Sequence, residues 1–298
     1  MSIGMHTARS DQISLLAPAK VNLFLHITGR RENGFHELES LFVRTSFGDQ
    51  VTVEGADKLS LNITGPFSGA LQQHPCEDNL VMKAAKSMLA HHDKTVGAKI
   101  TLEKNLPLAS GIGGGSADAA ATLLALMALW QVDISNKALH AMALELGADV
   151  PACLDNQPQL VKGIGEICES VNLGFNAAAL LVNPGISVST PDVFKTYRAS
   201  AIPFSQKLDE KTDVVSTIHQ LEKATRNDLF EPTSALSPVI NNVIKILRDL
   251  PDQKMVRMSG SGATCFALFN SLLEAEKASK FILEKKPSWW VAPCHLLG

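Results

Sequence analysis

Four glycines fall within five consecutive positions, 111–115, and this segment has the clearest chemical use in the sequence. It follows an alternating apolar stretch and precedes a continuous apolar one, so we expect it to join a strand to a helix. A loop without Cβ atoms lets backbone N–H groups approach a polyphosphate, and the following helix adds unpaired N–H groups and the positive end of its dipole. The segment therefore predicts a phosphate-binding loop. The alternative is an ordinary flexible helix start.

The predicted nucleotide loop runs without interruption from the end of the strand into the helix: Pro107, Leu108, Ala109, Ser110, Gly111, Ile112, Gly113, Gly114, Gly115 and Ser116. No Lys-Ser or Lys-Thr pair follows the last glycine, so the loop is not a Walker A motif, and its setting is not that of the G-x-G-x-x-G dinucleotide fold. A second cluster, 259–263, contains Ser259, Gly260 and Gly262. That cluster fits a second wall for phosphate or substrate, or an ordinary tight hairpin.

Two charged residues are candidates for acid-base chemistry. Asp149 follows Gly147, expected at the C′ position of a helix, and precedes Val150-Pro151, where proline favours an extended Val150. A carboxylate on such a stiff corner suits a general base, although it would also serve as a turn cap. Lys20 opens a strand and could offset phosphate charge, or could be a solvated lysine at a strand edge.

Three segments, 18–23, 107–120 and 259–263, occur in this order and span most of the chain. Together they resemble the motifs of the small-molecule kinase superfamily named for galactose, homoserine, mevalonate and phosphomevalonate kinases. Further segments resemble the branch of that superfamily whose acceptor alcohol carries a cytidine diphosphate group: 17–25, 34–36, 77–80, 147–151 and 226–229.

The resemblance implies a ribosomal-protein-S5-like N-terminal domain, a ferredoxin-like C-terminal domain and an active site between them. It also implies transfer of the γ-phosphate of ATP, with Mg²⁺ carried by the nucleotide, to a hydroxyl of the small-molecule substrate. Asp149 aligns with the catalytic base, Lys20 with the lysine beside it, and 111–116 with the ATP phosphate loop. Asn79 is assigned to the nucleotide, and Ala117 departs from the Ser-Ser often found after the triple glycine.

For the acceptor, the resemblance aligns His36 with the residue that hydrogen-bonds cytosine, and Phe35 and Phe194 with the aromatic pair that sandwiches the base. Tyrosine is common where this chain has Phe35, so a hydroxyl contact is expected to be lost while stacking remains. Composition alone would make His36 and Phe194 packing or surface residues. The other residues assigned to the substrate are Asn22, Ser259, Gly260 and Gly262.

The composition of the chain argues against several other classes of function. The net charge of −3, from 27 basic and 30 acidic residues, gives no reason to expect nucleic acid or an anionic membrane as a partner. The longest apolar stretch, 119–130, is shorter than the roughly 18 to 20 residues that span a bilayer, and the first dozen residues contain no apolar signal, so we expect a cytoplasmic protein. Five cysteines without a C-x-x-C pair and nine histidines without an H-x-x-x-H pair predict neither disulfides nor a protein-bound metal centre.

The strands and helices that must position these residues are interspersed without a regular βα repeat, which predicts an α+β fold. We expect an N-terminal ATP-binding domain at 1–158 and a C-terminal substrate-binding domain at 159–298. Alternation at 22–27 and the Asn33-Gly34 turn predict a hairpin. Further strands are expected near 38–47, 50–54, 58–64, 97–103, 178–183, 254–258, 264–269 and 290–294. Helices are expected near 79–92, 116–130, 135–146, 211–224, 234–249 and 273–285.

Two other functions stay open at this point. Another kinase of the same superfamily, acting on mevalonate or homoserine, would share the loop and the charged pair but would not bind a cytidine diphosphate group. A nucleotide-binding regulator without turnover would keep the fold, although the joint presence of Lys20, Asp149 and the glycine loop argues against it. The sequence leaves monomer and homodimer equally open.

Overall fold

The computed structural model describes residues 12–91, 96–208 and 216–298. The strands are β1 (Gln12–Arg30), β2 (His36–Ala56), β3 (Ser60–Thr64), β4 (Gly97–Glu103), β5 (Gln159–Gly163), β6 (Ile167–Ser170), β7 (Ala178–Asn183), β8 (Met255–Met258), β9 (Cys265–Phe269) and β10 (Trp290–Leu297). The helices are α1 (Ser68–Leu71), α2 (Leu80–Ala90), α3 (Gly114–Trp130), α4 (Asn136–Leu146), α5 (Thr190–Ala199), α6 (Ile218–Ala224), α7 (Phe230–Leu236), α8 (Val239–Arg248) and α9 (Leu272–Lys285), with 3₁₀ turns η1 (Cys76–Asp78) and η2 (Pro151–Cys153).

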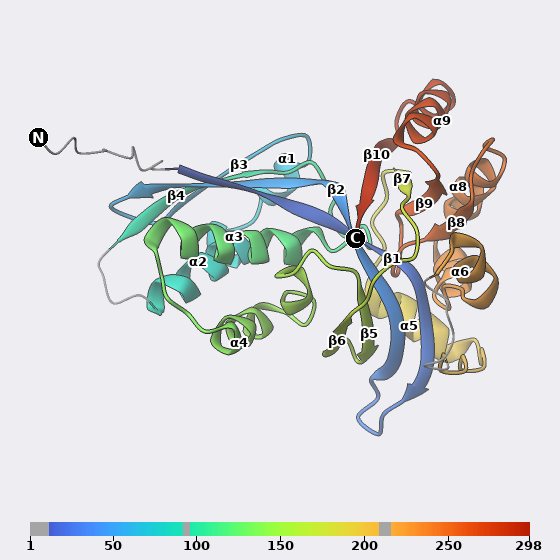
Figure 1. Cartoon of the computed structure of the whole chain (residues 1–298), viewed down its shortest axis with the longest axis horizontal. Helices are drawn as coiled ribbons and strands as arrows, with labels where there is room; N and C mark the ends of the chain where they lie inside the picture. Colours follow the sequence, from blue (N-terminus) through green and yellow to red (C-terminus); the bar gives the residue numbers. More distant parts are fainter. Residues whose placement is uncertain (1–11, 92–95, 209–215) are drawn as a thin grey trace, which may run out of the picture.

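The antiparallel hairpin β1–β2 runs through both halves of the molecule (Figure 1). Its turn is closed by the Gly34 N–H, which donates to Arg31 O at 2.9 Å, and Gly34 has the left-handed φ of 88° that a glycine adopts without strain. The predicted Asn33-Gly34 turn is therefore confirmed. The strands expected at 38–47 and 50–54 are one strand, β2, because β1 pairs along its whole length.

Strand β2 joins the two halves into one sheet. Its edge away from β1 pairs with β5 at 38–42, with β10 at 44–45 and with β4 at 50–56. Among the described residues the main order is β3-β4-β2-β10-β7-β9-β8. The predicted α+β class is confirmed, and the domain boundary at 158 stays a prediction, since β5 beyond it pairs with β2.

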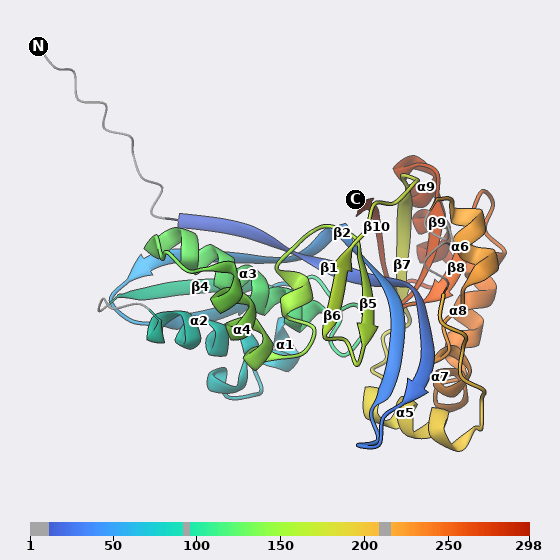
Figure 2. The ribbon, with the colours of Figure 1, turned by 60° about the horizontal axis from the view of Figure 1, so that its bottom comes forward.

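Helices cover this sheet on either side of the centre. In the first half α3 packs on β1 and β2, α2 packs beside α3, and α4 packs against α2 and α3 (Figures 1 and 2). The alanine-rich α3 is buried around most of its circumference, as expected of an apolar helix of high intrinsic propensity. In the second half α8 and α9 pack on β7 to β10, and a separate apolar core forms there. A third apolar core, with residues from β1, β2, β7 and β9, joins the two halves.

Several local predictions need correction. The helix expected at 234–249 is two helices, α7 and α8, because Pro238 lacks an N–H to continue the first and caps the second. Helix α5 and the short hairpin β5–β6 were not predicted. The expected helix at 211–224 is described only from 216 and contains α6, and residues 209–215 lie outside the described residues, as does residue 92 at the end of the expected helix 79–92. No helix in the described ranges is long and apolar enough to span a membrane.

Candidate active site

A cavity of about 1160 Å³ lies where the two halves meet. It brings together most residues singled out from the sequence: Lys20, Asn22, Phe35, His36, Asn79, Pro107, Leu108, Ala109, Ser110, Gly111, Gly113, Gly114, Gly115, Ser116, Asp149, Phe194 and Gly260. Three predicted residues do not line it. Ile112 points into the apolar core, whereas Ser259 and Gly262 belong to a loop that packs behind the glycine loop.

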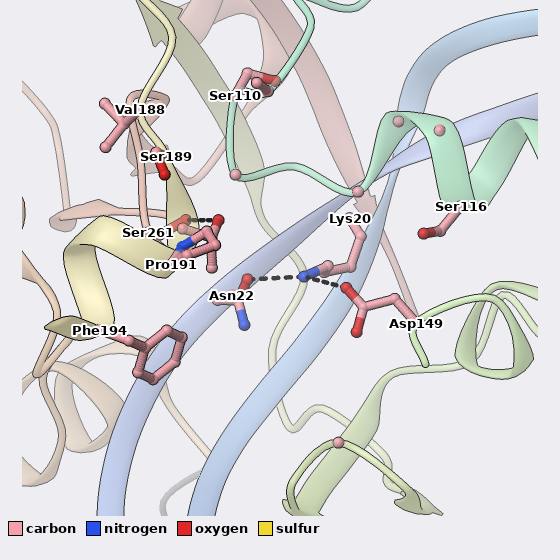
Figure 3. Close-up of a pocket in the computed structure, with 18 of the residues that line it drawn as sticks. Lys20, Asn22, Ser110, Ser116, Asp149, Val188, Ser189, Pro191, Phe194 and Ser261 are labelled. Atoms are coloured by element: carbon pink, nitrogen blue, oxygen red, sulfur yellow. Dashed lines mark hydrogen bonds and ion pairs between the residues drawn. The ribbon is translucent and has the colours of Figure 1, made fainter. Parts of the chain in front are cut away.

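Lys20 and Asp149 form the charged centre of the cavity (Figure 3). The Lys20 Nζ lies 3.7 Å from Asp149 Oδ2, donates to Asn22 Oδ1 at 3.1 Å and sits 4.0 Å from the centroid of the Phe42 ring. Lys20 is 6% exposed, so its ammonium group is held in place by these partners. Its backbone N–H donates to Ile112 O at 2.8 Å, which ties the lysine to the glycine loop.

Asp149 stands on a short corner between α4 and η2. The Val150 N–H donates to Gly147 O at 3.1 Å, and Val150 is fully buried, so a hydrogen bond and packing hold the corner. Two details differ. Val150 is helical at φ −68° and ψ −42°, because it caps the 3₁₀ turn that Pro151 begins, and Gly147 has an extended φ of 162° with no left-handed C′ conformation. The Asp149 side chain keeps 45% of its surface exposed toward the cavity.

The two glycine clusters form one interlocked wall. Ser259 Oγ donates to Gly111 O at 2.9 Å, and the Thr264 N–H donates to Ser110 O at 3.1 Å. Gly111 has φ +76°, and a Cβ built there would lie 2.5 Å from Ser259 O, so this approach requires glycine. The 259–263 cluster is therefore a support for the glycine loop and no free hairpin.

A buried ion triad, missed from the sequence, underlies the start of α3. The Lys104 ammonium group pairs with Asp118 at 2.6 Å and with Asp49, whose other oxygen accepts the Leu106 N–H at 2.8 Å. Burial raises the pKa of Asp118 to about 8, against the opposing effect of Lys104. A Cβ on Gly114 would lie 3.1 Å from Lys104 Nζ. The triad supports the glycine loop where α3 begins. The sequence analysis missed it because Asp49, Lys104 and Asp118 follow no recognisable spacing in the sequence.

The end of the cavity near His36 is aromatic. The His36 ring stacks on Phe194 with centroids 5.3 Å apart and planes at 22°, and meets Tyr197 edge-on at 5.5 Å. Burial lowers the pKa of His36, which favours a neutral imidazole with one donor and one acceptor nitrogen. Phe35 is 59% exposed at the hairpin turn. A flat ring with a polar edge would find both stacking surfaces and hydrogen-bonding groups here.

Helix α5 contributes residues that the sequence analysis did not assign. Ser189 caps its first turn, and Thr190 shares a 2.7 Å hydrogen bond with Ser261 of the second glycine cluster (Figure 3). The sequence does contain a helix-start signal there, because Ser189 is followed by Pro191 in the first turn. Asn79 also has a structural role: its Oδ1 accepts a hydrogen bond of 2.9 Å from the Val81 N–H and so caps α2.

Comparisons with known proteins agree with this geometry. Residues 79–157 match the family described as GHMP kinases N terminal domain, and residues 211–287 match GHMP kinases C terminal. A homoserine kinase from Cytophaga hutchinsonii shares the fold, with a TM-score of 0.71 at 22% identity over 99% of this chain and 98% of its own. The chain therefore belongs to the GHMP kinases, and the two-domain fold expected from the sequence is confirmed.

Full-length relatives define the branch within that family. The chain is 45% identical over 284 residues to 4-diphosphocytidyl-2-C-methyl-D-erythritol kinase of Cereibacter sphaeroides, covering 95% of this chain and 98% of the relative. It is 41% identical over 285 residues to the same kinase of Paramagnetospirillum magneticum, covering 96% and 99%. A crystal structure of 4-(cytidine 5'-diphospho)-2C-methyl-D-erythritol kinase superposes with a TM-score of 0.79 at 33% identity, covering 96% and 100%. Within the GHMP kinases, the chain belongs with these kinases.

Proposed function

We propose that this protein transfers the γ-phosphate of ATP to the 2-hydroxyl of 4-diphosphocytidyl-2-C-methyl-D-erythritol, a step of non-mevalonate isoprenoid precursor synthesis in the cytoplasm. The observation that carries the proposal is the placement of the Lys20–Asp149 pair, 3.7 Å apart, in one cavity with both the glycine loop and the aromatic pocket. The glycine loop binds the ATP phosphates. The aromatic pocket anchors cytosine and thereby carries the acceptor hydroxyl to Asp149.

Each side chain then has a defined role. Asp149 accepts the proton of the attacking hydroxyl, since its carboxylate is exposed to the cavity and stands on a rigid corner. Lys20 offsets phosphate charge and orients the acceptor from a position fixed by Asn22 and Phe42. His36 reads the polar edge of cytosine while Phe35 and Phe194 supply the ring contacts. Most of the acceleration comes from positioning and electrostatics.

Mg²⁺ is expected to enter with the nucleotide, where it neutralises the phosphate charge. Such an ion keeps several waters and is held mainly by phosphate oxygens, so it needs few protein ligands. The part of the chain that is described holds no cluster of three or more His, Cys, Asp or Glu residues suited to a metal. Ser116 lines the cavity, so its hydroxyl fits this partial role.

The test is ADP release measured with a panel of acceptor alcohols: the cytidyl substrate, its uridyl analogue, mevalonate and homoserine. We expect turnover with the cytidyl acceptor and poor use of the uridyl one, because a hydrogen-bonded edge rejects a mismatched partner strongly. Equal use of both bases would remove the cytosine-reading role, and turnover only with mevalonate or homoserine would move the protein to another branch. No ADP release with any acceptor would favour a nucleotide-binding regulator.

Asp149→Asn is the matched variant for the proposed chemistry. It preserves shape and removes the base, so we expect turnover to fall roughly 10²- to 10⁴-fold while ATP affinity stays nearly the same. Turnover close to wild type would exclude Asp149 as the base and leave the kinase assignment intact.

A further inference from the structure

Asn227 is a buried amide that does not line the active-site cavity. It is 9% exposed, and both of its amide hydrogen atoms are donated to the backbone. Its Nδ2 donates to Met258 O and to Gly260 O, both at 2.8 Å. Its Oδ1 accepts the Leu229 N–H at 2.9 Å. An amide that uses its donors and its acceptor in this way has one orientation, so Asn227 fixes the backbone around Gly260.

The backbone next to Asn227 is hydrogen-bonded to β1 on both sides. The Leu25 N–H donates to Arg226 O at 3.0 Å, and the Asp228 N–H donates to Leu25 O at 2.8 Å. The Asp228 carboxylate is 5% exposed and accepts the Ile27 N–H at 2.7 Å. Asn227 therefore joins two parts of the molecule, because its main chain is held on β1 and its side chain holds the second glycine cluster.

Gly260 lies where the second glycine cluster meets the glycine loop. Its φ is +54°, and a Cβ built there would lie 3.0 Å from Gly111 O and 3.3 Å from Asn22 Oδ1. That Asn22 oxygen accepts a hydrogen bond of 3.1 Å from Lys20 Nζ. A shift of the Gly260 backbone would therefore affect the glycine loop and a partner of Lys20 together.

The bond from Asn227 to Gly260 O also sets the direction of the Gly260–Ser261 peptide. The C=O and N–H groups of one trans peptide point in opposite directions, so the Ser261 N–H is turned away from Asn227. Ser261 lines the cavity, and no described residue accepts its N–H. A backbone N–H held in a fixed direction beside a cavity is a preorganised donor for an anionic oxygen.

We propose that Asn227 is a positioning residue for the phosphoryl transfer: it holds the second glycine cluster against the glycine loop and keeps the Ser261 N–H available to the phosphate oxygens of ATP. The inference rests on the proposed role of the glycine loop in binding those phosphates. Asn227 itself touches no substrate, so its effect passes through the backbone of 258–261.

Two substitutions remove the amide donors in different ways. Asn227→Asp keeps the shape and the acceptor for the Leu229 N–H, but it replaces the NH₂ group with an oxygen that faces Met258 O and Gly260 O. Asn227→Ala removes all three bonds without burying a charge. Both should raise the dissociation constant for ATP about tenfold, measured by calorimetric titration, and lower kcat about tenfold. The acceptor KM should stay within about threefold, because the proposed cytosine pocket lies near His36.

Ile282→Ala is the control for lost stability. Ile282 is fully buried on α9, which packs on β7, β9 and β10, so this variant should have a lower melting temperature and ATP affinity within about twofold of wild type. Ser259→Ala tests the path of the effect, because Ser259 Oγ donates to Gly111 O at 2.9 Å. In the Asn227→Ala, Ser259→Ala double variant the two losses of ATP affinity should combine to less than their product, since both loosen the same contact.

Each outcome decides the inference. A folded Asn227→Ala variant with ATP affinity and kcat within about twofold of wild type would overturn it, and fully multiplicative losses in the double variant would overturn the path through the second glycine cluster. If neither Asn227 variant melts cooperatively, the residue serves overall stability and the inference is wrong. If wild type itself does not bind ATP, the proposed function fails and the inference fails with it. Normal ATP binding and turnover in wild type, with unaffected Asn227 variants, would reject the inference alone.

Discussion

Gly111→Ala tests whether the two glycine clusters act as one wall. The added Cβ would lie 2.5 Å from Ser259 O and 2.7 Å from Gly262 O, and both obstructing atoms are backbone, which cannot rotate away. Gly111 also has φ +76°, a conformation that alanine adopts only with strain. The loop must therefore shift, change its backbone conformation, or separate from its support.

The loss of stability in Gly111→Ala follows from the backbone strain and from the hydrogen bonds between the two loops. The left-handed conformation costs alanine about 1–2 kcal/mol. Separation of the two loops also removes the hydrogen bonds from Ser259 Oγ to Gly111 O and from the Thr264 N–H to Ser110 O, each worth about 1 kcal/mol. We expect a loss of about 3–4 kcal/mol in the free energy of unfolding. Since the displaced carbonyls and N–H groups belong to the loop that we propose binds the ATP phosphates, the KM for ATP should rise at least about tenfold.

The assay is urea denaturation combined with ATP kinetics at saturating acceptor. Gly55→Ala is the matched control, because a Cβ on Gly55 meets no atom within 4 Å and its φ lies outside the left-handed region. That control should stay within about 0.5 kcal/mol of wild type with unchanged kinetics. If Gly111→Ala behaves like Gly55→Ala in both measurements, the loops are independent and the reasoning is wrong.

Three further outcomes are expected. Gly114→Val should weaken ATP binding far more than acceptor binding, measured by titration of each ligand, because its side chain meets the Lys104 ammonium group of the buried triad. Phe194→Ala should raise the KM for the acceptor about ten- to a hundredfold, through loss of roughly 1–3 kcal/mol of base stacking, and leave ATP parameters alone; an unchanged acceptor KM would place the base elsewhere. Burial lowers the pKa of His26 to about 4, so the native state gains stability from neutral His26 above about pH 6.5 and loses it as the pH falls toward 4. Wild type should therefore lose up to about 3 kcal/mol more than His26→Gln between pH 7.5 and 4, by urea denaturation, and equal losses would contradict this.

Local patterns predicted most elements of the fold. Strand alternation, the Asn33-Gly34 turn and the alanine-rich run after the glycine loop each depend on neighbours in sequence, and each element appears where expected. The errors arose where two local conformational preferences competed and the weaker one was used for the prediction. Pro238 divides one expected helix because a proline also caps helices well, and Val150 is helical because the 3₁₀ turn outweighs the usual preference before proline.

The predicted site was limited to residues that belong to recognisable motifs. Lys20, Asp149 and the glycine loop stand out because their neighbours in sequence are unusual. Lys104 and Asp49 carry no such mark, since a lone charged residue on or beside a strand is ordinarily solvated, and only the folded sheet shows that they are buried. Their roles depend on contacts between strands that are distant in sequence.

Strand β1 shows why those contacts matter for function. At one point its Lys20 N–H binds the glycine loop, and two residues later the Asn22 N–H donates to Ser259 Oγ at 3.0 Å, on the loop that supports it. Further along, the Ile27 N–H donates to Asp228 Oδ2 at 2.7 Å, in the second half of the molecule. One strand therefore contacts the glycine loop, the loop that supports it and the second half of the molecule. Because these contacts lie along one strand, a displacement of the second half would be transmitted through β1 to Lys20 and to the glycine loop.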